Sequence, residues 1–158
     1  MESIIEKLKD LINNFDPVSY LPDIASIMSW ASLFAQVCIL VAPAVMLLCG
    51  LRYLVFPPKE ANHEAGYRFY FGMGSVEAWR FTQLFAGIVW TLMGLGLGIA
   101  MYLTSQEFPA MELGPMVDKA VICILWQIGL IVLSYIVINL TLIIRFNRHG
   151  DVRWRKRA

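Results

Sequence analysis

Three long stretches without charge constrain what this chain can fold into more than any other feature. They cover about residues 27–51, 81–103 and 120–144, and none contains Asp, Glu, Lys, Arg or His. Roughly 20 helical residues, each rising about 1.5 Å, cross a hydrocarbon core about 30 Å thick. Backbone polar groups in lipid must be satisfied within the segment, so each stretch is expected to be a helix. The first continues to about residue 56, where Pro57-Pro58 ends it.

The composition supports the same fold class. Only 16% of the 158 residues are charged, compared with about 25% in soluble domains. The net charge of +1 gives no reason to expect nucleic-acid binding, because the positive residues gather beside the apolar stretches. The three cysteines fall inside these stretches and are expected to be reduced packing residues. We therefore expect one all-α integral membrane domain over residues 1–158, with transmembrane helices at 27–56, 81–103 and 120–144.

The distribution of Lys and Arg predicts the orientation. Three spans place the N-terminal segment and the 104–119 loop on one side, with three positive residues, and the 52–80 segment and the 145–158 tail on the other, with ten. The positive-inside rule then puts the N-terminus outside and the C-terminus inside a cell membrane, either the inner or the plasma membrane. The 57–80 segment and the basic tail are thus expected in the cytoplasm. The tail would attract anionic lipid or dock a cytoplasmic protein.

An additional helix is predicted before the first span. Apolar residues recur at helical spacing over residues 3–15, with charged residues between them. The segment is too short and too charged to cross a bilayer, which is typical of an amphipathic interfacial helix. It is expected either on the outer membrane surface or over the outer end of the helix bundle.

Two patterns within the spans predict helix packing. Gly87, Gly94 and Gly98 share one face of the second span, and small residues allow helix backbones to approach closely in lipid. This face packs either within the chain or as a homodimer seam. The third span carries a polar stripe at heptad spacing, which should face protein or water rather than lipid; it consists of Gln127, Ser134 and Thr141. Pro43 should kink the first span.

The segment between the first two spans is the most polar part of the chain. Its turn-forming residues are Asn62, Gly66, Gly72 and Gly74. Ser75 is the expected N-cap of a helix that begins near Val76, and Glu77 would complement the dipole of its first turn. The aromatic residues here are expected at the lipid headgroup level; they are Tyr67, Phe69, Tyr70, Phe71 and Trp79. Arg68 lies among them and would pair with Glu64 or Glu77, stack on a ring, or bind a lipid phosphate.

No pattern in the chain indicates catalysis. His63-Glu64 lacks the second His that a zinc-binding helix requires, because position 67 is Tyr. The glycines near Ser75 are not followed by the Lys of a phosphate-binding loop. We therefore expect no catalytic residue, no metal site and no cofactor.

The same segment resembles the SdpI/YhfL family of bacterial membrane proteins. The resemblance rests on Asn62-x-x-x-Gly66-x-Arg68, then Ser75-x-Glu77-x-Trp79, then Gln83 and Gly87, and it covers roughly residues 58–103. Phe69 stands where the family often has Thr. The resemblance implies a small inner-membrane protein and, from the best-known member, immunity to a secreted toxin peptide together with membrane recruitment of a transcriptional repressor.

Three functions remain open from the sequence. The first is a non-enzymatic interaction protein that confers resistance to a membrane-active peptide toxin, with a cytoplasmic regulator as a further partner. The second is a subunit of an oligomeric transporter or pore lined by polar side chains of the third span, including Asn139. The third is an enzyme that modifies lipid head groups, suggested by Arg68 at the interface.

Overall fold

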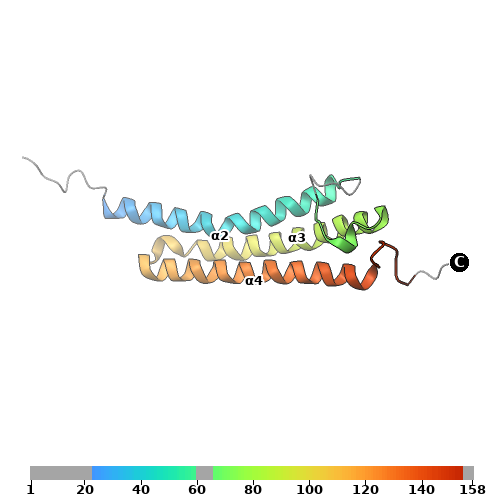
Figure 1. The fold of residues 1–158 in the computed structure, drawn as a ribbon. Helices are drawn as coiled ribbons and strands as arrows, with labels where there is room; N and C mark the ends of the chain where they lie inside the picture. Colours follow the sequence, from blue (N-terminus) through green and yellow to red (C-terminus); the bar gives the residue numbers. More distant parts are fainter. Residues whose placement is uncertain (1–22, 60–65, 155–158) are drawn as a thin grey trace, which may run out of the picture.

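A computed structural model of the chain describes residues 23–59 and 66–154. In these residues the fold is all-helical, with three long helices: α2 (Ile24–Val55), α3 (Val76–Ser105) and α4 (Leu113–Arg145). Two short 3-10 helices, η2 (Tyr70–Gly72) and η3 (Phe108–Ala110), lie in the connections. The long helices run side by side and alternate in direction, so the α2–α3 loop and the chain after α4 meet at one end (Figure 1). The predicted helix over 3–15 and the motif residue Asn62 lie outside the described residues.

Each long helix is long and apolar enough to cross a membrane, as the sequence predicts. The outer surface of the bundle is correspondingly apolar: Trp30, Phe34 and Trp126 expose 71%, 72% and 69% of their area. Extended apolar surface of this kind marks a site of membrane or protein contact. The structure is therefore compatible with a multi-pass membrane protein.

The helices extend beyond the apolar stretches from which they were predicted. α4 already begins at Leu113, so the connection before it is shorter than the expected 104–119 loop. Pro115 does not prevent this earlier start, because the first N–H groups of a helix have no partner within it. The intrahelical pattern begins directly after it, where the Met116 N–H donates to the Glu112 carbonyl at 3.0 Å. The apolar stretch therefore predicts the span of α4, while backbone hydrogen bonds extend this helix further toward the N-terminus through more polar residues.

A bend near the middle of α2 is visible in Figure 1, and the sequence of α2 explains it. Pro43 lies inside this helix and has no N–H, so the carbonyl of Ile39 loses its usual helical donor. That carbonyl instead accepts a hydrogen bond of 3.0 Å from Nε2 of Gln127 on α4. Gln127 is 1% exposed. A polar side chain of one helix thus satisfies the carbonyl that proline leaves free in another.

Glycines bring α2 and α3 into close contact. A Cβ atom added to Gly94 would lie 2.5 Å from the backbone nitrogen of Leu47, and one added to Gly50 would lie 2.5 Å from that of Thr91. Gly87 also faces α2, since a Cβ added there would lie 3.2 Å from the Gly50 carbonyl oxygen. The predicted glycine face is therefore covered by α2 within the chain. Gly98 lies at the looser end of this contact, where the nearest atom to an added Cβ is that of a proline side chain at 3.9 Å.

Candidate functional site at the loop end of the bundle

Residues 66–75, in the connection between α2 and α3, fold onto the ends of the helices and form a cap. We define the cap as residues 66–75, the first two turns of α3, and the turn at 146–152 that follows α4. It contains the motif residues Gly66, Ser75, Trp79 and Gln83 in one structural unit. Its parts are distant in the sequence and meet at the right-hand end of the bundle in Figure 1.

A buried pair of hydrogen bonds joins the loop to α3. The Tyr67 N–H donates to Oε1 of Gln83 at 2.8 Å, and Nε2 of Gln83 donates to the Tyr67 carbonyl at 2.9 Å. The Gln83 side chain has no exposed area. One amide side chain thus pairs with both backbone polar groups of Tyr67. Burial makes the loss of either bond costly.

The side chain of Tyr67 continues this connection to α4. Its hydroxyl donates to Oδ1 of Asn139 at 2.8 Å. Its ring lies 5.6 Å from the rings of both Trp90 and Tyr135, edge-on to the first. Burial raises the pKa of the Tyr67 hydroxyl above its ordinary value, and the neighbouring Tyr135 adds to the shift. An ordinary tyrosine is already protonated at physiological pH, and the raised pKa extends to higher pH the range in which this hydroxyl donates.

Trp79 fixes the start of the loop. Its Nε1 donates to the Pro58 carbonyl at 2.8 Å, and its side chain has no exposed area. Gly66 lies against the Trp79 ring with a φ of +111°, a backbone conformation that favours glycine. A Cβ at this position would lie 2.9 Å from both Trp79 and Gln83. The glycine of the motif is thus required by both conformation and space.

The expected aromatic belt is wrong for two of its five residues. Tyr67 and Trp79 are 4% and 0% exposed and bond inside the protein, so they do not lie among lipid headgroups. Each has a polar atom that finds an internal partner, which makes burial of the whole ring favourable. Tyr70, in contrast, is 66% exposed.

Ser75 links the beginning of α3 to the turn after α4. Its Oγ accepts the Ala78 N–H at 3.1 Å, which makes it the N-cap of α3, and donates to the Gly150 carbonyl at 2.7 Å. Gly150, with a φ of +79°, leaves no room for a Cβ, which would lie 2.4 Å from the Ser75 nitrogen. Part of the predicted basic tail is therefore folded against the loop.

The turn after α4 is stabilised by its own polar contacts. Asn147 Oδ1 accepts the backbone N–H groups of His149 and Asp151, a typical Asx turn. The guanidinium of Arg153 donates to the Phe146 carbonyl at 2.9 Å. The guanidinium carbon of Arg145, just before the turn, lies 4.1 Å from the centre of the Phe81 ring at the start of α3. This distance is within the range of a cation–π contact. Two of the basic residues predicted to meet lipid or a partner thus have defined positions beside the cap.

The charged motif residues lie on the outside of the cap. Arg68 and Glu77 are both exposed, and each takes part in an interaction within the structure. The buried motif residues therefore build the cap, while Arg68 and Glu77 are the ones that a partner could reach. Among the described residues, no three His, Cys, Asp or Glu side chains are grouped as metal ligands would be.

The polar stripe of the third span divides between interior and surface. Gln127 and Ser134 are buried at 1% and 3% exposure, but Thr141 borders an open groove with Arg145 and Trp154. The hydroxyls of Ser134 and Thr141 donate to carbonyls of their own helix, at 2.7 and 2.8 Å. The stripe therefore supplies one of the hydrogen bonds between helices, through Gln127, and no continuous polar surface.

Sequence patterns did not single out the partners of three cap residues: Asn139 for Tyr67, Gly150 for Ser75, and Pro58 for Trp79. Asn139 was noted only as a polar residue of the third span. Its place in an otherwise apolar stretch gave no sign of a tyrosine partner.

Together these observations define the class: a small all-helical protein with three helices of membrane-crossing length and an ordered polar and aromatic cap at one end, in the part of the chain that the structure describes. Comparison with protein-family models, with curated proteins and with solved structures gives no match for the chain.

Proposed function

We propose that this protein is a non-enzymatic membrane protein whose cap binds a peptide or protein partner, and that it protects the cell against a membrane-active peptide in the manner of the SdpI/YhfL family. The observation that carries the proposal is the construction of the cap. Its resemblance motif supplies the framework through the buried Trp79 and Gln83 and the half-buried Gly66, and presents Arg68 on the surface. A rigid framework around an exposed charged residue is suited to recognition.

The proposed orientation places the cap in the cytoplasm and the α3–α4 connection outside a bacterial inner membrane. It is supported by the excess of Lys and Arg at the cap end. Labelling of single cysteines with a membrane-impermeant maleimide tests it, in a background whose native cysteines are replaced by serine. Arg148→Cys probes the cap end and Glu112→Cys the other, both at exposed positions. In intact cells we expect reaction at position 112 only. Reaction at position 148 without reaction at 112 would reverse the proposed orientation.

The resistance role is tested by expressing the chain in a sensitive bacterial strain and challenging the cells with a panel of membrane-active peptides. Wild type is expected to raise survival against at least one peptide, and both Arg68→Ala and Gln83→Leu are expected to remove the gain. Gly96→Ala is the matched control, because an added Cβ there meets nothing within 4 Å. Immunoblots of the membrane fraction verify equal amounts of each variant. Equal survival of wild type and Arg68→Ala cells for every peptide would reject the proposal.

The pore alternative gains no support from the positions of its polar residues. The Gln127 amide bonds to Ile39 within the chain, and the Ser134 hydroxyl returns to its own helix. These groups are thus already used inside one copy of the protein.

A further inference from the structure

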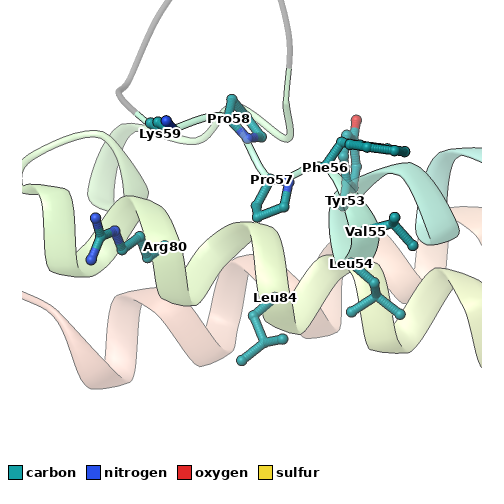
Figure 2. A pocket seen from close by; sticks show the side chains of 9 residues that line it. All are labelled: Tyr53, Leu54, Val55, Phe56, Pro57, Pro58, Lys59, Arg80 and Leu84. Carbon is teal, nitrogen blue, oxygen red and sulfur yellow. The ribbon is translucent and has the colours of Figure 1, made fainter.

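A groove of about 570 Å³ opens beside the cap, between the end of α2 and the beginning of α3. Its volume is in the range of small-molecule sites. It does not use the buried cap residues described above, although the Pro58 wall of the groove is held in place by the hydrogen bond from Trp79. Figure 2 shows the nine lining side chains.

The two walls of the groove change from apolar to cationic in the same direction. On α3, Leu84 and Arg80 are four residues apart and so lie on one face, with Arg80 nearer the helix start. On the other wall the chain passes from Leu54 and Val55 at the end of α2 to Lys59. Figure 2 shows Arg80 and Lys59 toward one end of the groove and the leucines away from it.

The charged residues of the described groove lining are of one sign. Its described lining contains Lys59 and Arg80 and no acidic residue. Both cations are exposed, so their head groups can reach a ligand from the surrounding medium. Arginine and lysine together favour a phosphate group, one through its fixed fork of donors and the other as a point charge.

The position of this change from apolar to cationic lining, relative to the membrane-crossing stretches of α2 and α3, indicates the class of ligand. α2 and α3 are both long enough to cross a bilayer, and the groove lies where they leave their apolar stretches. Leu84 and Val55 expose 53% and 61% of their area, so the apolar part of the groove is open to the lipid acyl region. A phospholipid has the same order: an anionic phosphate at the surface and hydrocarbon beneath it.

We propose that this groove is a binding site for an anionic phospholipid, with its phosphate held by Lys59 and Arg80 and the upper part of an acyl chain lying against Leu54 and Leu84. Basic pockets beside membrane helices bind anionic lipid head groups through the same combination of charge and apolar contact. The inference requires that α2 and α3 cross a bilayer. It does not depend on the proposed resistance role.

The test measures lipids that remain bound to the full-length protein. The purified protein is reconstituted in nanodiscs of mixed phosphatidylcholine and phosphatidylglycerol, released into the gas phase, and examined by native mass spectrometry. Wild type is expected to retain phosphatidylglycerol over phosphatidylcholine. In the double variant Lys59→Gln with Arg80→Gln this preference is expected to fall roughly thirtyfold, the order for two basic residues near a charged surface.

Two further variants separate this site from general attraction of charge. Arg148→Gln removes an exposed cation of the same end that does not line the groove, and it should leave the preference unchanged. Leu84→Trp fills the apolar part while both cations remain, and it should lower retention of phosphatidylglycerol; circular dichroism verifies that its helices are intact. Inorganic phosphate added before release should not displace the lipid.

Three results would each overturn the proposal. They are a loss in Arg148→Gln as large as in the double variant, unchanged retention in folded Leu84→Trp, and displacement of the lipid by free phosphate. The last result would show that the groove binds the phosphate group without the lipid.

Discussion

The hydrogen bond between Gln127 and the Ile39 carbonyl allows a quantitative test of how the bundle accommodates its proline. If Gln127 is needed because Pro43 has no N–H, its contribution must vanish when position 43 regains a donor. Gln127→Met keeps the approximate volume and removes the amide donor, and Pro43→Ala restores the backbone N–H. The two substitutions and their combination form a double-mutant cycle.

The structure fixes the expected size of the coupling. Gln127 is 1% exposed and its bond to Ile39 is 3.0 Å long, so Gln127→Met leaves a buried carbonyl without a partner. Such a loss costs about 1–3 kcal/mol in soluble proteins, and interhelical hydrogen bonds in membranes contribute about 0.6 and at most about 1.7 kcal/mol. We therefore expect Gln127→Met to lower the free energy of unfolding by about 1 kcal/mol in the wild-type background. In Pro43→Ala the same substitution should cost much less, because the new backbone N–H at position 43 would serve the Ile39 carbonyl.

The assay is reversible unfolding in mixed micelles with increasing fractions of dodecyl sulfate, followed by helical circular dichroism. Pro43 is itself buried and packs near Gly94 and Gly98, so Pro43→Ala has a cost of its own. The cycle subtracts that cost. Equal losses for Gln127→Met in both backgrounds, within about 0.3 kcal/mol, would refute the compensation of the proline by Gln127.

Three other predictions follow from the packing and the cap. Gly94→Ala places a Cβ 2.5 Å from the Leu47 nitrogen, so it should lower the free energy of unfolding by about 1–3 kcal/mol in the same assay. Gly96→Ala, whose added Cβ meets nothing within 4 Å, should be nearly neutral. Equal effects of the two substitutions would contradict the close approach of α2 and α3. Gln83→Leu leaves two backbone groups of Tyr67 unpaired in a buried site. The Tyr67 amide should then exchange hydrogen at least roughly tenfold faster, as measured by mass spectrometry. Unchanged exchange would exclude the two hydrogen bonds between Tyr67 and Gln83. Because burial raises the pKa of Tyr67, the folded protein keeps a proton that the unfolded chain loses above about pH 10. The free energy of unfolding should therefore fall more steeply above that pH in wild type than in Tyr67→Phe. Parallel plots of this free energy against pH would argue against the shift.

The parts of the fold that follow from local chemistry could be predicted from the sequence. Apolar stretches without charge identified all three long helices, and Ser75 marked the start of α3 because an N-cap is a contact within three residues. Similarly, Pro43 predicted a bend in α2. The start of α4 at Leu113 was not predicted. Hydropathy identifies the apolar stretch of a helix, whereas the helical hydrogen bonds of α4 begin in the more polar residues before it.

The parts that depend on distant partners could not be predicted. Aromatic residues beside a span usually lie at the membrane interface. Tyr67 is buried instead, because it bonds to Gln83 and to Asn139, which are 16 and 72 residues away in the sequence. The glycine face was identified, but its partner Gly50 was not, because a single glycine in an apolar run has no periodic signal. The orientation, the helix over 3–15 and the resemblance to the SdpI/YhfL family remain predictions.

The double role of the Ser75 hydroxyl has a mechanical consequence. The same oxygen holds the Ala78 N–H of one helix and bonds to the carbonyl of Gly150 beyond another. A molecule that lifted the C-terminal turn would break the second of these bonds and expose Gly150 and the Ser75 backbone, which now lie against each other. Force applied to the 146–152 turn would therefore act directly on the beginning of α3 until this bond breaks.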